Sequence, residues 1–201
     1  MTIALYSENF LMSFAETSTH EGGWSNHKDD PGGMTFMGMT RKAYAAWRGV
    51  PASSITEQDM RNIPLAERQQ FYHELYWCPV GADDLPGGLD FVVWDISVNS
   101  GPKRAVKMLQ KAINKLGRIK VRVDGVIGPK TISAAGYANV FDLIDEVGNT
   151  RLWFYLSLST FKTFGGGWMK RLVKVTSFGT AMALGRAQAV IMSRQTYRGG
   201  V

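Results

Sequence analysis

The chain has 201 residues, of which 45% are hydrophobic and 20% are charged, with a single cysteine, Cys78. These proportions are typical of one globular domain, or of one domain with a small annex, and exclude disordered, fibrous and disulfide-stabilised classes. The net charge of +6 is uneven, because residues 1–102 carry a net −7 and residues 103–201 a net +13. The basic half is either a solvated face or a surface for a polyanion such as nucleic acid, an anionic membrane or a cell-wall polymer.

Membrane insertion and classical secretion are not indicated. No apolar run reaches the roughly 18 to 20 residues that a spanning helix needs. The first fourteen residues lack a basic start and contain Glu8 and Asn9 where an apolar run should lie. We therefore expect a soluble protein without a signal peptide.

Residues 1–101 are expected to be mostly helical, with one loop-rich insertion. An amphipathic pattern begins after Ser7 and runs toward Glu21, and an apolar helix is expected from Leu89 to Gly101. Three further helix starts are predicted at Thr40, at a capping box of Thr56 with Asp59, and at Pro64. Between them, residues 24–39 are dense in Gly, Asn, Asp and Pro, which predicts a loop or a short hairpin.

The second half is predicted to be helical around one exception. A basic amphipathic helix is expected at 103–116, and further helices at 131–137, 140–147, 151–161 and 179–194, with Gly165-Gly166-Gly167 as a flexible break. The exception is residues 118–130, where Asp124-Gly125 between β-branched residues gives a strand and turn signal.

The densest group of reactive side chains lies between His20 and Thr35. It places a carboxyl, Glu21, at a predicted helix end and a second, Asp30, in a polar segment nine residues later. Glycoside hydrolysis needs one protonated carboxyl as acid and one ionised carboxylate that orients water or stabilises positive charge. Burial beside Trp24 and the negative helix end both raise the expected pKa of Glu21.

The segment Glu21–Thr40, EGGWSNHKDDPGGMTFMGMT, resembles the signature of glycoside hydrolase family 108, which opens E-G-G-[YW]-x-N, continues D-x-G-G-x-T and closes G-[IV]-T. Met39 departs from the β-branched residue usual in the last element. WDISVNSGPKRAVKMLQKAI, Trp94–Ile113, is similar to the family's D-x-x-x-N-S-G-x-x-x-A-x-x-x-L-Q segment. VDGVIGPKTISA, Val123–Ala134, and FGGGWMKR, Phe164–Arg171, resemble elements of the associated peptidoglycan-binding region.

The resemblance implies an N-acetylmuramidase of the phage endolysin type with Glu21 as general acid. By analogy with phage lysozymes, Asp30 would be the base or electrostatic partner and Thr35 would hold the attacking water. Trp24, Asn26, Asn99 and Ser100 are the expected substrate-binding residues. The implied fold is mainly α: a lysozyme-like helical domain, residues 1–101, with a short loop or β-hairpin after the catalytic Glu, and a helical peptidoglycan-binding region, residues 102–201.

Several other residues have a structural as well as a functional interpretation. The three His and one Cys have no metal-ligand spacing, so no metal and no cofactor are expected, and Cys78 is predicted to be a small buried residue. Asp95, in an apolar helix, would need a hydrogen-bonded partner if buried. Besides Trp24, three tryptophans are considered for sugar stacking or, more simply, for core packing: Trp94, Trp153 and Trp168.

The expected function is hydrolysis of the β-1,4 bond between N-acetylmuramic acid and N-acetylglucosamine, with lysis of a bacterial host. A lytic transglycosylase and a non-catalytic wall-binding scaffold are the alternatives. The expected partner is the peptidoglycan glycan strand, with the basic second half, including Lys170, Arg171 and Lys174, on the anionic envelope. Nucleic acid is not expected, and the protein is expected to be a monomer, held in the host cytoplasm until a holin releases it.

Overall fold

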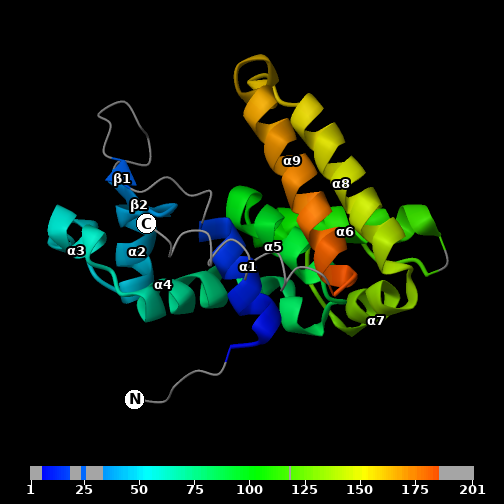
Figure 1. Cartoon of the computed structure of the whole chain (residues 1–201), viewed down its shortest axis with the longest axis horizontal. Coiled ribbons are helices and arrows are strands. Elements are labelled where there is room, and N and C mark those ends of the chain that lie inside the picture. The colour runs from blue at the N-terminus through cyan, green and yellow to red at the C-terminus, as the bar shows by residue number, and fades with distance from the viewer. Residues whose placement is uncertain (1–5, 19–23, 26–33, 118, 186–201) are drawn as a thin grey trace, which may run out of the picture. The chain divides into compact units, whose positions relative to one another are not determined.

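The computed structural model describes residues 6–18, 24–25, 34–117 and 119–185 (Figure 1). By its internal contacts the chain divides into two compact units: residues 13–75 form one, and residues 1–12 together with 76–201 form the other. Helix α1 (Glu8–Ser18) contributes to both. None of the described helices is long and apolar enough to cross a lipid bilayer.

The unit of residues 13–75 contains short helices that begin at the predicted caps. The Thr40 side chain accepts a hydrogen bond from the backbone N–H of Ala43, and Thr56 forms a capping box with Asp59. Pro64 directly precedes a third helix. These helix starts are therefore confirmed. The helices are α2 (Arg41–Arg48), η1 (Ala52–Ser54), α3 (Glu57–Arg61) and α4 (Leu65–Tyr72).

Residues 24–40 of this unit include a small antiparallel sheet in the order β1 (Trp24–Ser25), β2 (Thr35–Phe36), β3 (Met39–Thr40). Trp24 lies opposite Phe36, and Thr35 lies between Ser25 and Thr40. Met37 and Gly38 connect β2 to β3 with φ of +50° and +78°. Two successive positive φ angles give the tight turn whose twist suits a hairpin, so the predicted short hairpin is present and carries a third strand.

The other unit is built around one apolar helix. Its elements are η2 (His73–Trp77), which begins in the first unit, η3 (Cys78–Val80), η4 (Ala82–Asp84), α5 (Leu89–Ser100), α6 (Pro102–Leu116), α7 (Pro129–Tyr137), α8 (Val140–Leu156) and α9 (Phe161–Ala183). Residues 89–97 of α5 are all buried, because α6, α8 and α9 pack around them. A helix that is apolar all round belongs in an interior. Helices α8 and α9 run antiparallel beside each other (Figure 1).

The start of α5 and the last turns of α9 touch through two glycines. A Cβ on Gly179 would lie 2.5 Å from Val92 Cγ2 and 2.9 Å from the Gly88 carbonyl oxygen. A Cβ on Gly88 would overlap the Gly179 carbonyl. The backbones approach this closely only because neither residue has a side chain.

Two predicted helix boundaries are wrong. Gly165-Gly166-Gly167 was expected to be a flexible break, but α9 runs through all three residues. Residues 140–156 form the single helix α8, where two helices were expected. A mid-helix glycine costs about 1 kcal/mol relative to alanine, and the packing of α9 against α8 and α5 outweighs that cost.

The strand signal at 118–130 is also wrong, since the described residues of this segment contain no strand. Two amide side chains of α6 take the place of a partner strand. Gln110 donates to Asp124 Oδ1 and to the Val126 carbonyl and accepts from the Gly125 N–H, while Asn114 pairs with both backbone groups of Val121. Gly125 has φ +79°, as a turn there requires, and a Cβ would meet the Lys103 carbonyl at 2.8 Å. The turn is therefore confirmed without the strand.

Candidate functional site

The expected site residues fall into three groups. Glu21, Asn26 and Asp30 lie outside the described residues. Trp24 and Thr35 lie in strands β1 and β2 of the unit formed by residues 13–75. Asn99 and Ser100 end helix α5 in the other unit, exposed and half-buried respectively.

Trp24 and Thr35 lie on neighbouring strands but on opposite faces of the small sheet. Directly opposed residues share a face, and successive residues of a strand alternate. The register therefore places Trp24 with Phe36 and Met39, and Thr35 with Thr40. A sugar stacked on Trp24 and a water held by Thr35 would approach the sheet from different sides.

The indole ring of Trp24 already has a cationic neighbour. The guanidinium carbon of Arg61 lies 4.1 Å from the ring centroid, within the range of a cation–π contact. Arg61 is itself held by Glu57, 2.7 Å away, within helix α3. A sugar could therefore stack only on the opposite ring face.

The turn after Thr35 is anchored to helix α4. The Tyr72 hydroxyl donates to the Met37 carbonyl at 2.8 Å, and Met39 is 1% exposed. The Arg41 N–H donates to the Met34 carbonyl at 2.8 Å, on the other side of β2. These contacts give Thr35 a defined position, which a residue that holds a water for reaction requires.

Asn99 contributes to helix α5 rather than standing free beside it. Its Nδ2 donates to the Asp95 carbonyl at 2.8 Å and lies 3.5 Å from Asp95 Oδ2. Its amide nitrogen is therefore engaged with the preceding helical turn, and its exposed part is what a substrate would meet. Gly101, with φ +85°, ends the helix after Ser100.

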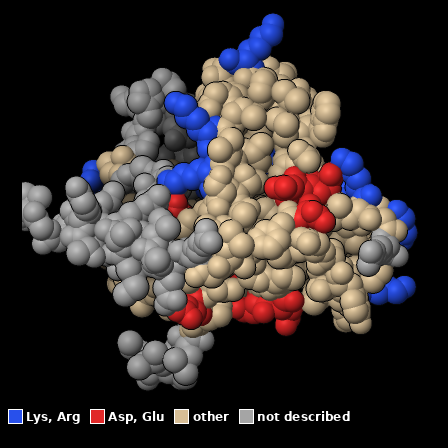
Figure 2. Space-filling view, turned by 45° about the vertical axis from the view of Figure 1, so that its right-hand side comes forward, with Lys and Arg blue, Asp and Glu red and all other residues tan. Residues whose placement is uncertain are grey.

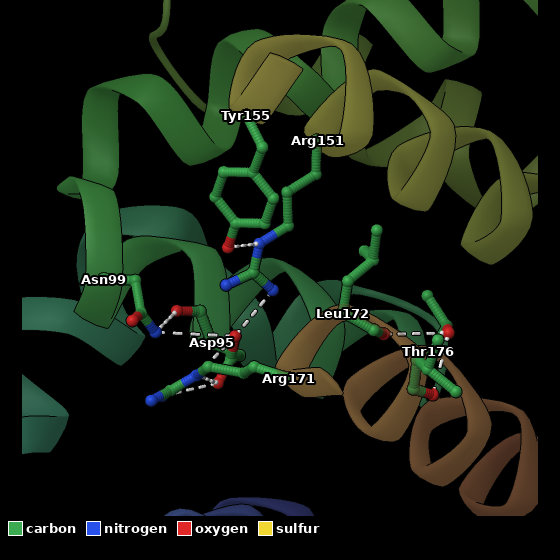
Figure 3. Close-up of polar contacts among 8 residues, drawn as sticks. Asp95, Asn99, Arg151, Tyr155, Arg171, Leu172 and Thr176 are labelled. Atoms are coloured by element: carbon green, nitrogen blue, oxygen red, sulfur yellow. Dashed lines mark hydrogen bonds and ion pairs between the residues drawn. The ribbon is translucent and has the colours of Figure 1, made fainter. Parts of the chain in front are cut away.

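Asp95 is the centre of a buried ion cluster that draws α5, α8 and α9 together (Figure 3). Arg151 Nη1 lies 2.7 Å from Asp95 Oδ2, and Arg171 Nη2 lies 2.8 Å from Oδ1. Arg151 Nε donates to the Tyr155 hydroxyl at 2.6 Å, and burial raises the pKa of Tyr155. Asp95 is 2% exposed and Arg151 1%. The expectation that a buried Asp95 needs a hydrogen-bonded partner is confirmed, and two of its partners are cationic.

The cluster changes how Arg171 is interpreted. Two guanidinium groups share one carboxylate, and both Nε and Nη2 of Arg171 face Asp95. Arg171 was expected among the residues that hold the envelope, but this side chain is 22% exposed and bound to the core. Reversing its charge would disturb the fold before it reported on envelope binding.

A second buried carboxylate, Asp90, fixes the start of α5. It accepts hydrogen bonds at 2.7 Å from Asn9 Nδ2, from the Gly88 N–H and from the Phe91 N–H. Burial nevertheless raises its pKa to about 6, because desolvation outweighs these three bonds. Asp90 was not singled out from the sequence, where it is one of several acids near a glycine pair.

The remaining candidates separate by exposure. Trp94 is fully buried, and Trp168 stacks on Tyr155 at 5.2 Å, so both serve packing. Trp153 is 69% exposed. Cys78 is exposed, so its predicted burial is wrong: the apolar residues on either side of it, Trp77 and Val80, fill the core instead. Among the described residues, no group of three or more His, Cys, Asp or Glu is placed to hold a metal ion.

Comparison with known proteins gives two family matches and a structural relative. The model described as Glycosyl hydrolase 108 matches residues 14–101, and that described as Predicted Peptidoglycan domain matches residues 104–173. The solved structure of Brucella abortus SagA is similar at 37% identity, with a TM-score of 0.75, over 87% of this chain and 95% of that one. No curated protein matches.

Proposed function

Since the chain belongs to glycosyl hydrolase family 108, we propose that it hydrolyses the β-1,4 bond from N-acetylmuramic acid to N-acetylglucosamine. Membership makes it a glycoside hydrolase, and the second family match makes peptidoglycan its partner. The identity of the bond that is cleaved is the more specific part of the proposal. The E-G-G-W-x-N and D-x-G-G-x-T patterns around Glu21 and Asp30 support it.

Glu21 is the proposed general acid, Asp30 the base or electrostatic partner, and Thr35 the residue that holds the attacking water. The observation that carries this assignment is the pairing of β1 with β2, in which Ser25 lies opposite Thr35. Asp30 lies in the sequence between these two paired residues, which face each other across one sheet. Glu21 precedes the same sheet by three residues. Three residues of the required chemistry thus belong to the chain immediately around one anchored hairpin.

The proposed reaction transfers one proton and adds one water. Glu21 donates its proton to the glycosidic oxygen as the bond from that oxygen to the anomeric carbon of muramic acid breaks. A water oxygen bonds to that carbon and releases a proton. The ionised Asp30 takes this proton, or it stabilises the positive charge while the ionised Glu21 takes the proton back. The products are a reducing muramic acid end and a free hydroxyl on N-acetylglucosamine.

We further propose that the two regions expected from the sequence have different functions. Residues 1–101 form the catalytic region and residues 102–201 the wall-binding region, and the two family matches, which meet between residues 101 and 104, support this boundary. The setting that fits is a monomeric phage or prophage endolysin, held in the host cytoplasm until a holin gives it access to the wall. Lysis of that host is the expected outcome.

The test is mass spectrometry of the fragments released from purified peptidoglycan in water enriched in heavy oxygen. The wild-type protein should release reducing muramic acid ends that carry the heavy isotope, and Glu21→Gln should abolish release. Asp145→Asn, an exposed carboxylate on α8, is the matched control and should remain active. Anhydro-muramic ends would identify a transglycosylase, and undiminished release by Glu21→Gln would remove Glu21 from the acid role.

A further inference from the structure

Helices α6 and α8 enclose a groove of about 520 Å³ that is lined by cations and by an exposed tryptophan. The groove lies wholly within the unit that contains residues 76–201. None of the expected site residues lines it. Its lining residues, called the α6–α8 groove below, are Arg104, Lys107, Met108, Lys111, Lys115, Glu146, Thr150, Trp153, Phe154 and Ser157.

The cations form a single row along α6. Arg104, Lys107, Lys111 and Lys115 recur at intervals of three and four residues, so they share one face of the helix. The row spans roughly 16 Å at the helical rise per residue. The opposite face is buried, since Ala105, Val106, Leu109 and Ala112 are all 0% exposed.

This row is unfavourable for the helix itself. Like charges four residues apart on a helix repel, and α6 contains no acidic residue that would offset them. Among the lining residues the one acid is Glu146, which lies 2.9 Å from Lys115 at one end. Lys107 and Lys111 therefore repel each other without gain to the fold, unless an anion binds between them.

An exposed aromatic surface lies beside the row. Trp153 on α8 is 69% exposed, whereas Trp168 on α9 stacks on Tyr155. The guanidinium of Arg104 lies 4.6 Å from the Phe154 ring centroid, which fixes that cation against the groove wall. A flat apolar ring next to fixed positive charges suits a ligand with flat sugar faces and anionic groups.

Cations also lie on the surface outside the groove, among them Lys130 and Lys162. On the face drawn in Figure 2, Lys and Arg side chains form separate groups with acidic groups between them. A general attraction to the envelope would need no ordered row and no exposed ring. The α6–α8 groove has both within one hollow, so it is suited to a particular ligand.

We propose that the α6–α8 groove binds peptidoglycan at a distance in sequence from the hydrolytic residues, with a sugar on Trp153 and the carboxylates of the peptide stems on Lys107 and Lys111. This inference rests on peptidoglycan being the substrate of the enzyme. All the lining residues lie within the range of the peptidoglycan family match, which favours a stem-bearing glycan over nucleic acid.

The test is sedimentation of the full-length protein with insoluble peptidoglycan freed of phosphate polymers, in 0.15 M salt. Every variant carries Glu21→Gln so that the glycan is not consumed. Lys107→Ala with Lys111→Ala, and separately Trp153→Ala, should each weaken binding at least about fivefold. The matched control, Lys130→Ala with Lys162→Ala, removes two exposed cations outside the groove, one on α7 and one on α9, and should change binding less than about twofold.

Glycan strands stripped of their peptide stems identify the anion. To these stripped strands, the protein with an intact groove should bind as weakly as the Lys107→Ala, Lys111→Ala variant does. Trp153→Ala should weaken binding to the stripped strands further. The proposal would be overturned if the groove double variant and the control double variant lost equal amounts of binding. Release of reducing ends by the wild-type protein reports separately on the proposed hydrolysis. Circular dichroism confirms the fold of each variant.

Discussion

Replacing Asp95 by Asn tests the buried cluster most directly. The change keeps the shape of the side chain and removes one negative charge from between Arg151 and Arg171. Arg151 is 1% exposed. Among the described residues, Asp95 is the one carboxylate with which Arg151 forms an ion pair. The substitution therefore leaves a buried guanidinium without its counter-charge.

The expected cost follows from that burial. Breaking a buried ion pair by removing one partner typically costs about 3–5 kcal/mol, because the remaining charge stays desolvated. Arg171→Gln should cost less, about 1–2 kcal/mol, since Asp95 keeps Arg151 and since Arg171 is 22% exposed. For a domain whose unfolding free energy is typically about 5–15 kcal/mol, the first change removes a large share.

Urea unfolding followed by tryptophan fluorescence measures both values. The fully buried Trp94, in the same helix as Asp95, supplies a signal from the core. The double replacement Asp95→Leu with Arg151→Met should recover much of the loss, because an apolar pair of similar volume avoids the desolvation cost. An Asp95→Asn cost below about 1 kcal/mol, or one smaller than that of Arg171→Gln, would refute the reasoning.

Three further substitutions test the start of α5 and helix α9, which packs against it. Burial holds the pKa of Asp90 at about 6, above its unfolded value of 3.8, so its contribution to stability is full below about pH 4 and lost as the pH rises through 6. This loss of unfolding free energy amounts to at most about 3 kcal/mol, and Asp90→Asn should abolish it. Urea unfolding midpoints of the wild-type protein and of Asp90→Asn, measured from pH 4 to 7, test this. Midpoints that change with pH in parallel for the two proteins would contradict the prediction. Gly179→Ala should lower the unfolding free energy by about 1–3 kcal/mol, because its Cβ would meet Val92 Cγ2 at 2.5 Å. A Cβ on Gly166 would meet no atom within 4 Å, so Gly166→Ala should instead stabilise α9 by about 0.5–1 kcal/mol. If the melting temperatures of Gly179→Ala and Gly166→Ala shift in the same direction, packing is not the cause.

Features that depend on neighbours in the chain were predictable. A threonine hydroxyl caps a helix through an N–H three residues away, so Thr40 and Thr56 identified helix starts without tertiary information. The turn at Asp124-Gly125 and the short hairpin after Trp24 have the same local origin. The proposed roles of Glu21, Asp30 and Thr35 also rest on a local signal, since the family resemblance is a pattern of neighbouring residues.

Features that depend on distant partners were not predictable. Asp95 is 56 residues from Arg151 and 76 from Arg171, and nothing near any of them in the sequence indicates the pairing. The strand expected at 118–130 failed for a related reason. Its β-branched residues do favour an extended backbone, but Gln110 and Asn114 occupy the hydrogen-bonding groups that a second strand would have used. Propensity describes the segment, whereas its partner decides the element.

The same distinction changes what the family patterns mean. Asp95 and Asn99 belong to the D-x-x-x-N-S-G pattern, and Arg171 ends the F-G-G-G-W-M-K-R pattern. From the sequence alone, Asn99 was expected to bind substrate and Arg171 to hold the envelope. The ion pair joins these patterns, from the ranges of two different family matches, within one core. Arg171 therefore serves the fold, and the cations left for an anionic wall include the row along α6 beside Trp153. A pattern shared by a family indicates that residues act together, but only their packing shows whether they act on the substrate or on each other.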